Sequence, residues 1–125
     1  MFGSLRRSIL NTYPHSYTAI RTFTASTMTS KQQFLLVAWD YTDADAPTRR
    51  MAVRPDHLAG AAADKKTGMI ISGGAILDSH VNGKMIGSSM IFQGDSEQEI
   101  RDRIARDPYV TGKVWEKWEL FPYRE

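Results

Sequence analysis

Two ionisable side chains, His57 and Asp107, have the clearest potential for acid–base chemistry in this chain of 125 residues. A neutral imidazole exchanges protons near pH 7, and a carboxylate bonded to one ring nitrogen fixes the tautomer and leaves the other nitrogen for a substrate. Each residue lies next to or near a proline at a predicted helix border, in Arg54-Pro55-Asp56-His57-Leu58 and Asp107-Pro108-Tyr109. The two segments are far apart in sequence, so only the elements between them can bring the pair together.

The same residues also have a purely structural interpretation. His57 is then a half-buried helix residue, and Asp107 ends a helix and begins a turn. Arg54 either binds a substrate carboxylate or lies solvated at the surface, and it shares a face with His57 only if the helix is continuous. Tyr109 either donates a hydrogen bond into a cleft or packs as an ordinary aromatic side chain.

Three small residues are further candidates for contact with a substrate. Gly73 and Gly74 either admit a ligand close to the backbone or form a bulge. Ser88 is either a polar contact on the floor of a cavity or an ordinary strand serine, since nothing near it in sequence activates it as a nucleophile.

Several classes of site are excluded or disfavoured. The absence of cysteine excludes disulfides, thiolate nucleophiles and cysteine-based zinc or iron–sulfur sites. Asp78 and His80 lie beside a predicted hairpin turn, where such residues are usually exposed, so we expect no metal site. No phosphate-binding loop, dinucleotide fingerprint or catalytic-triad spacing is present, and we expect no cofactor.

The charge is unevenly distributed along the chain. Residues 1–31 hold four of the sixteen Lys and Arg and none of the fourteen Asp and Glu, so residues 32–125 carry twelve basic against fourteen acidic side chains. A folded part without excess positive charge argues against nucleic-acid binding. No apolar run approaches the ~18 residues of a membrane span, so no membrane insertion is expected.

Residues 1–31 have the composition of a mitochondrial presequence, being rich in Ser, Thr and Arg and free of acids. The segment from Arg21 to Ser26 resembles a two-step matrix processing site. We therefore expect a mitochondrial protein whose folded domain is residues 32–125. The alternative is a cytoplasmic protein with a solvated N-terminal extension, or initiation at Met28.

Hydrophobic patterning predicts six elements between residues 33 and 121, in the order β-α-β-β-α-β. Pro55 leaves open whether the first helix is kinked or divided in two, and a division would place His57 in a first helical turn. The Gly73-Gly74 pair is expected to end or bulge the second strand. The expected strands are residues 33–39, 69–72 with an outward continuation over 75–80, 84–92 and 114–121. The expected helices are residues 47–67 and 96–107. In the second helix, Ile100 and Ile104 are expected to face the core, and Arg101, Arg103 and Arg106 to face water.

This order predicts an α+β fold of the ferredoxin-like class, with an antiparallel sheet and both helices on one side. Trp39, Trp115 and Trp118 cannot all lie on the helix side if the strands alternate regularly, and we expect Trp115 and Trp118 to face opposite sides. An uncovered apolar sheet face is a liability in a monomer. We therefore expect a homodimer with sheets packed face to face, or a ligand that covers the face.

With these features in place, residues 33–123 resemble the YCII-related family. The resemblance rests on Arg54-x-x-His57-Leu58, on Gly68 through Gly73-Gly74, on the third strand with Gly87, and on Asp107-Pro108-Tyr109. It implies a dimeric α+β barrel and a His57–Asp107 pair in a cleft. Many members have Gly-Pro where this chain has Gly73-Gly74. Some enzymatic relatives imply lyase or isomerase chemistry on small cyclic or aromatic substrates without a metal or organic cofactor.

Three functions remain open at this stage. The first is a cofactor-independent enzyme in which His57 moves a proton, Asp107 orients it, and the substrate is a small cyclic or enolisable molecule. The second is a non-catalytic module that binds a metabolite or a partner protein in the same dimer cleft. The third is an RNA-binding domain, which shares the topology. Against it, the third strand lacks the aromatic-and-basic signature of such domains, since Met85 to Phe92 is apolar and small.

The presequence prediction can be tested by import. Incubation of the full chain with energised isolated mitochondria is expected to give a protease-protected product whose N-terminus, read by mass spectrometry, lies near Lys31. A variant with Arg6, Arg7 and Arg21 changed to Gln is expected to stay outside. Full-length protein in the cytosolic fraction of cells would contradict the prediction.

Overall fold

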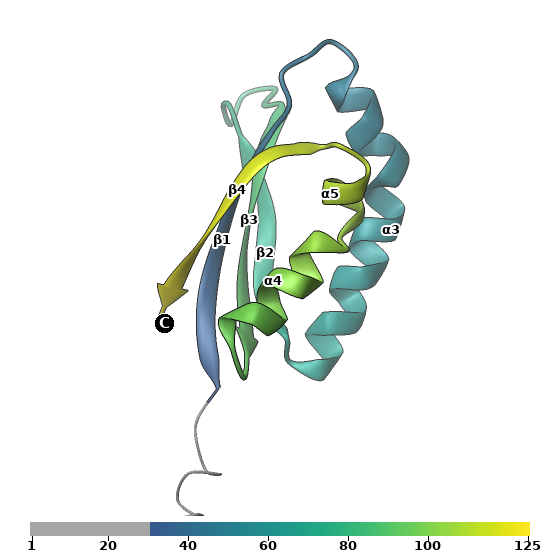
Figure 1. The fold of residues 1–125 in the computed structure, drawn as a ribbon. Helices are drawn as coiled ribbons and strands as arrows, with labels where there is room; N and C mark the ends of the chain where they lie inside the picture. Colours follow the sequence, from purple (N-terminus) through teal and green to yellow (C-terminus); the bar gives the residue numbers. More distant parts are fainter. Residues whose placement is uncertain (1–30) are drawn as a thin grey trace, which may run out of the picture. The chain divides into compact units, whose positions relative to one another are not determined.

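The computed structural model describes residues 31–125. The predicted presequence therefore lies, apart from Lys31, outside the described residues. The described part consists of one sheet with the helices packed against one of its faces (Figure 1). In chain order the elements are β1 Gln32–Asp40, α3 Ala46–Thr67, β2 Ile70–Leu77, β3 Met85–Gly94, α4 Glu97–Ala105, α5 Pro108–Thr111 and β4 Trp115–Tyr123.

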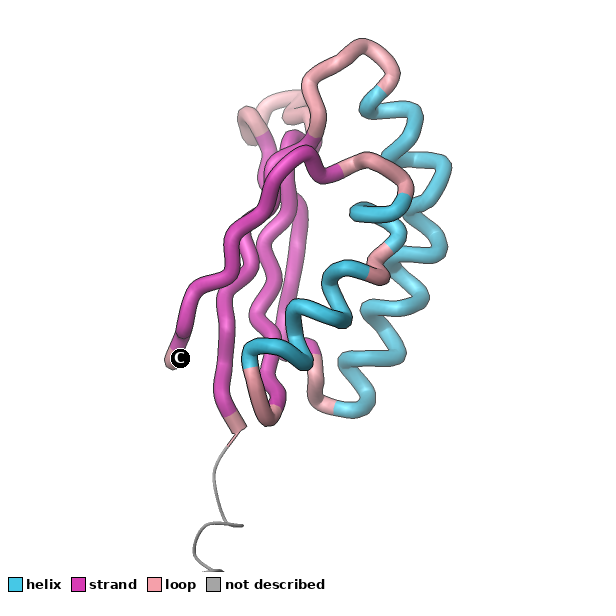
Figure 2. The backbone as a smooth tube through the Cα atoms, viewed as in Figure 1, coloured by secondary structure: helices cyan, strands magenta, loops and turns pink. Residues whose placement is uncertain are grey.

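The sheet has four strands in the order β2-β3-β1-β4, and every neighbouring pair is antiparallel. The tube view separates this sheet from the helical layer (Figure 2). Alternation along β1 shows why the residues pair in this register: Phe34, Leu36 and Ala38 are buried, while the residues between them are only partly buried. The predicted α+β, ferredoxin-like architecture is confirmed. The short helix α5 was not predicted.

The helix α3 runs continuously through Pro55. Pro55 and Met51, whose carbonyl loses its usual i+4 donor, both lie on the exposed side of the helix. Water can bind that carbonyl there, so the missing N–H does not break the helix. His57 is consequently a mid-helix residue and not a first-turn residue, and Arg54 shares its helix.

The prediction that Gly73-Gly74 ends or bulges the second strand is wrong. β2 continues through both glycines to Leu77, and its register shifts fall between Ile70 and Ser72 and between Ile76 and Leu77. Close packing explains why residue 73 is a glycine, because a Cβ there would lie 2.9 Å from Cγ of Met90 on the neighbouring strand. A Cβ on Gly74 would meet nothing within 4 Å.

The prediction that Trp115 and Trp118 face opposite sides of the sheet is also wrong. Trp39 pairs with Lys117, but Asp40 pairs with Trp115, so β4 contains one extra residue at this point. Such a bulge reverses the alternation. Trp115 is buried in the core, and Trp118 packs against the same cluster beneath the Arg101 guanidinium of α4.

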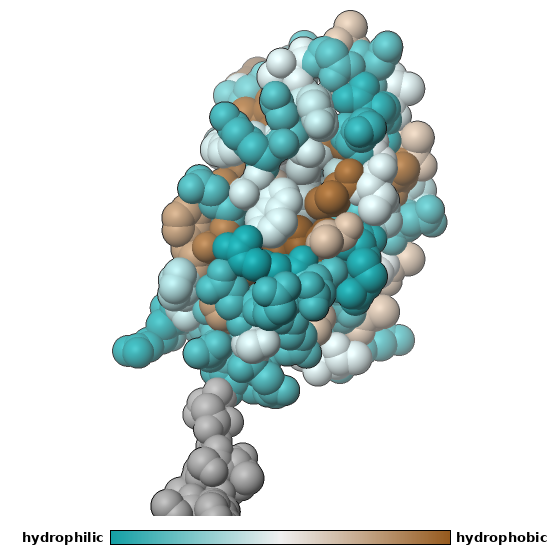
Figure 3. Space-filling view, in the orientation of Figure 1, coloured by the Kyte–Doolittle hydropathy of each residue, from teal (hydrophilic) through white to brown (hydrophobic). Residues whose placement is uncertain are grey.

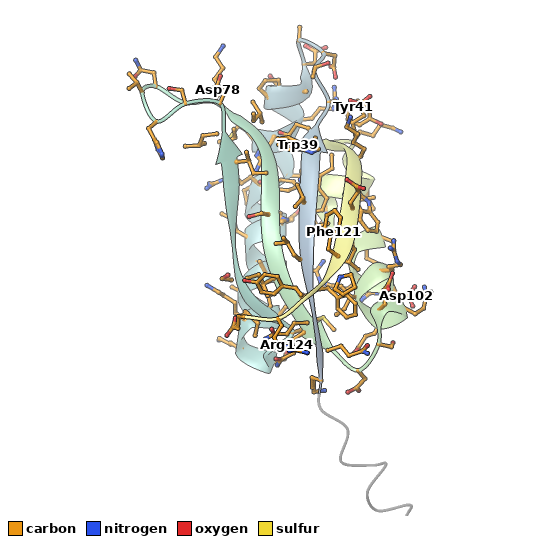
Figure 4. The ribbon with its side chains drawn as sticks, turned by 90° about the vertical axis from the view of Figure 1, so that its left-hand side faces the viewer. Trp39, Tyr41, Asp78, Asp102, Phe121 and Arg124 are labelled. Carbon is orange, nitrogen blue, oxygen red and sulfur yellow. The ribbon has the colours of Figure 1, made fainter. Side chains whose placement is uncertain are left out.

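The sheet face opposite the helices keeps an apolar surface (Figure 4). Trp39 and Phe121 are 39% and 43% exposed on this face. By register, Leu35, Val37 and Ile91 lie on the same side, since their neighbours Leu36 and Met90 point to the core. We call these five residues the outer sheet patch.

The face of the molecule seen in Figure 3 is mostly polar. Hydrophilic side chains cover most of the view in Figure 3, and apolar ones form small areas between them. None of the helices in residues 31–125 is both long and apolar enough to cross a bilayer.

Candidate active site

His57 and Asp107 meet in the structure, although 50 positions separate them. His57 Nδ1 lies 2.7 Å from Oδ1 of Asp107, and the two side chains are 9% and 2% exposed. The antiparallel order of the sheet returns the chain so that α5 packs on α3. This packing places the start of α5 against the middle of α3.

Asp107 is held in place by its own local structure. It is the N-cap of α5 in an extended conformation, and Pro108 occupies the first turn of that helix. Its Oδ1 accepts from the backbone N–H of Tyr109 at 2.9 Å as well as from His57, and its Oδ2 accepts from Arg103 at 3.0 Å. The carboxylate therefore joins α3, α4 and α5.

These bonds decide the charge of Asp107. Burial alone would raise the pKa of the carboxyl, but the hydrogen bonds from His57, from the Tyr109 N–H and from Arg103 outweigh it, so the pKa is lowered from its usual value. An ionised Asp107 accepts a proton-bearing Nδ1. His57 Nε2 is therefore left as the nitrogen that can receive a proton from a ligand.

Arg103 extends the pair toward the surface. Its Nε bonds Oδ2 of Asp64 in α3, while another of its guanidinium nitrogens bonds Asp107. The side chains of four residues thus form one hydrogen-bonded chain, in the order Asp64, Arg103, Asp107 and His57. Sequence reasoning assigned Arg103 to the solvent-facing side of its helix, but the residue is only 8% exposed. The interpretation was wrong because the side chain bonds Asp64 of α3 and is buried there.

Tyr109 fixes the plane of the imidazole. The two rings stack with centroids 3.8 Å apart and planes 14° from parallel, and Trp115 meets both rings edge-on. Burial raises the pKa of the Tyr109 phenol, against the opposing effect of Arg50 and Arg54, so its hydroxyl remains a donor at neutral pH.

His57 lies on the wall of a pocket of about 360 Å³ between α3 and the strands β2 and β3. Six of the seven predicted site residues line this pocket; Asp107 lies behind His57 and does not. The predicted lining residues are Arg54, His57, Gly73, Gly74, Ser88 and Tyr109.

Two further charged residues, Arg50 and Lys65, line the pocket but were not predicted from the sequence. A signal for them was present. Residues 50, 54, 57, 58, 61 and 65 recur at helical spacing and so share one face of a continuous α3. That face was not recognised, because the sequence left open whether the helix is continuous at Pro55. Within residues 31–125, no group of three or more His, Asp or Glu side chains is placed to hold a metal ion.

The fold and the pocket together define a small α+β protein with a buried histidine–aspartate pair at the wall of a ligand-sized pocket. The YCII-related domain model matches residues 32–124, and the chain belongs to this family. No curated protein matches the sequence.

Solved structures are similar to this chain over most of its length. One is 5-chloro-2-hydroxyhydroquinone dehydrochlorinase (TftG) from Burkholderia phenoliruptrix in complex with 2,5-dihydroxybenzoquinone, with a TM-score of 0.65, 21% identity, and coverage of 74% of this chain and 94% of that one. Another is a dimeric protein of unknown function with a ferredoxin-like fold from Bacteroides fragilis, with a TM-score of 0.45, 11% identity, and coverage of 75% and 96%.

The lowered pKa of Asp107 makes its contribution to stability depend on pH. The unfolded carboxyl titrates near pH ~3.9, above the folded one. As the pH falls through this range the unfolded state takes up the proton first, so the contribution is complete above pH ~4 and is lost below it. We expect Asp107→Asn to cost about 3 kcal/mol near pH 7, as for other broken buried pairs.

Urea unfolding of both proteins from neutral to acid pH measures this contribution as a difference in unfolding free energy. The comparison removes the opposing effect of Asp40, whose pKa burial raises. The difference between wild type and Asp107→Asn should shrink toward zero as the pH falls. Asp102→Asn, at an exposed position of α4, is the surface control. A difference between wild type and Asp107→Asn that stays constant to the lowest pH would contradict an ionised, bonded Asp107.

Proposed function

We propose that this protein is a cofactor-independent lyase or isomerase that uses His57 and Asp107 for proton transfer on a small cyclic or enolisable substrate. The supporting observation is the bond between His57 Nδ1 and the buried Asp107 carboxylate, with the imidazole on the pocket wall. A fixed tautomer with one nitrogen available to a ligand is what a general base requires.

The proposed step begins with a substrate C–H bond next to a carbonyl group. The bond breaks, its proton moves to Nε2 of His57, and the electron pair moves onto the carbonyl oxygen. Asp107 stabilises the imidazolium that forms and keeps its ring oriented. Return of the proton to a different carbon gives isomerisation, and loss of a leaving group from the neighbouring carbon gives elimination.

Similarity to TftG supports this class of reaction. That protein is a dehydrochlorinase, and its structure holds a small cyclic quinone. At 21% identity the similarity establishes the fold. The pocket of about 360 Å³ here has the size that small-molecule sites require.

A non-catalytic module that binds a metabolite or partner in the same pocket is the alternative. The observation in its favour is that Asp107 has a structural role of its own, as the cap of α5 and the partner of Arg103. A carboxylate held for these reasons would bond a nearby histidine without any role in catalysis.

Proton exchange separates the two functions, because it is observed on the substrate itself and does not require the product to be identified. We expect wild-type protein to accelerate exchange of C–H for deuterium in a panel of small cyclic ketones and hydroxyquinones, followed by NMR in D2O. His57→Gln should lower the rate about 100-fold or more, as expected when a general base is lost. Asp107→Asn should lower it by less.

His80→Gln is the matched control, because His80 lies on the exposed loop between β2 and β3. It should leave the exchange rate unchanged. Binding of a panel member by wild type, with no exchange in any of them, would favour the binding module.

We further propose that the protein is a homodimer joined through the outer sheet patch. This patch gathers Trp39, Phe121, Leu35, Val37 and Ile91 on the side of the sheet without helices. Burial of such a surface against a second copy would remove apolar area from water on both chains.

The dimer can be tested by sedimentation at micromolar concentration. Wild type should sediment as a dimer, and Phe121→Asp should shift it toward monomer because the carboxylate would be buried without a partner. Val81→Asp places the same charge on the β2–β3 loop, where Val81 is 79% exposed, and should leave the dimer intact. A monomeric wild type would refute the proposal.

A further inference from the structure

A second buried polar cluster lies in the same pocket as His57 and is not used by the proposed proton transfer. Arg50 is 4% exposed and bonds both carboxylate oxygens of Asp40, at 2.9 and 2.8 Å. It also donates to Oγ of Ser88 at 3.0 Å, and Trp115 donates its indole N–H to the same oxygen at 3.1 Å. Arg50 and Ser88 line the pocket.

The hydrogen bonds of Ser88 leave it as a donor. A hydroxyl has two acceptor lone pairs and one O–H. Arg50 and Trp115 occupy both acceptor positions. The Ser88 hydroxyl therefore has only its proton to offer a ligand.

Arg50 has a spare donor as well. Its Nε is buried and has no hydrogen-bond partner within residues 31–125. Buried N–H groups are nearly always bonded, and one without an acceptor costs stability. The two neighbouring residues thus each hold one donor without an acceptor, and a hydrogen-bond acceptor on a ligand would complement both.

The charge of the pocket has the matching sign. Arg50, Arg54 and Lys65 line it, and no Asp or Glu does. Asp40 neutralises Arg50, but Arg54 and Lys65 take no part in the ion pairs of residues 31–125. A ligand that enters the pocket meets two uncompensated cations, which favour a negatively charged ligand.

We propose that the pocket takes a small organic anion whose ionised oxygen accepts hydrogen bonds from the Ser88 hydroxyl and from Arg50 Nε, with Arg54 and Lys65 adding charge attraction. A phenolate, an enolate and a carboxylate share this chemistry. The inference rests on the proposed function because it assigns the substrate class of the same site. Apolar lining residues favour an anion with a carbon skeleton; they include Leu58, Ile70, Met85 and Met90.

Tyr109 connects this anion site with the proposed base. Its ring stacks on the imidazole of His57 and lies 4.6 Å from the guanidinium carbon of Arg50. An oxygen held by Arg50 and a carbon near His57 can therefore belong to one small molecule. Negative charge that develops on that oxygen during proton abstraction would be stabilised by the same donors.

Isothermal titration calorimetry of the full chain with matched probes tests the proposal. Benzoate is compared with neutral benzamide, and 4-nitrophenolate with neutral 4-nitroanisole, so that the carboxylate and phenolate arms are separate. At least one anion should bind about 10-fold tighter than its neutral partner, which corresponds to about 1.4 kcal/mol. Inorganic phosphate should bind more weakly than that anion.

Variants locate the binding. Ser88→Ala should reduce affinity for the anion about 10-fold and affinity for the neutral probe little. Lys65→Met should weaken the anion several-fold, whereas Lys66→Met, the same charge change on the neighbouring residue outside the pocket lining, should not. Lys65→Met keeps the test valid if Ser88→Ala fails to fold.

NMR provides an independent readout. The indole N–H signal of Trp115 should shift when the anion binds, because that N–H bonds Ser88. The indole signal of Trp39, on the opposite face of the sheet, should not.

Equal affinity for both members of each pair, no binding of either anion, or equal effects of Lys65→Met and Lys66→Met would overturn the anion site. These results are independent of proton transfer. Anion preference without any His57-dependent exchange would leave the anion site standing and refute the enzyme. His57-dependent exchange without anion preference would support the enzyme and refute the anion site.

Discussion

The buried Asp107 carboxylate is the interaction on which the described structure most depends. It accepts hydrogen bonds from His57 in α3, Arg103 in α4 and the backbone of Tyr109 in α5. A carboxylate with so little exposure is tolerated only when its oxygens are bonded, and here the bonds outweigh burial and keep it charged. One side chain therefore holds the helical layer together and orients the imidazole.

The packing of the helices around Asp107 also decides which polar groups line the pocket. α3 supplies His57 and the cations, and β3 supplies Ser88. Tyr109 of α5 is in contact with both His57 and Arg50. The acidic residues of the two clusters, Asp107 and Asp40, lie behind their partners and do not line the pocket. The pocket consequently presents donors and positive charge to a ligand, together with one nitrogen that can take a proton.

Patterns within single helices and strands predicted much of the fold and of the candidate site. Alternation in β1 and the helical period of α3 and α4 were readable because burial follows the geometry of each element. Asp107 before Pro108 marked a helix border, and it is the N-cap of a short helix. Six of the seven predicted site residues line one pocket because the ferredoxin-like order returns the second helical region to the first.

The predictions that were wrong depended on contacts between elements distant in sequence. The strand alternation that placed Trp115 and Trp118 on opposite faces is reversed by a bulge that only pairing with β1 reveals. Continuity through Pro55 depends on which side of α3 faces water. Arg103 reads as a solvent-facing residue of α4 until Asp64, 39 positions away, is brought beside it.

By itself, the sequence determined the order of the elements, the family, and the residue types able to exchange a proton, because periodicity and helix borders are local properties of the chain. Only the tertiary structure decided which residues share the pocket with His57. The acceptors that bond Arg50 and Ser88, and the donors left over, depend on contacts between elements distant in sequence. Charge and hydrogen bonding at a buried site are set by those contacts and not by residue type alone.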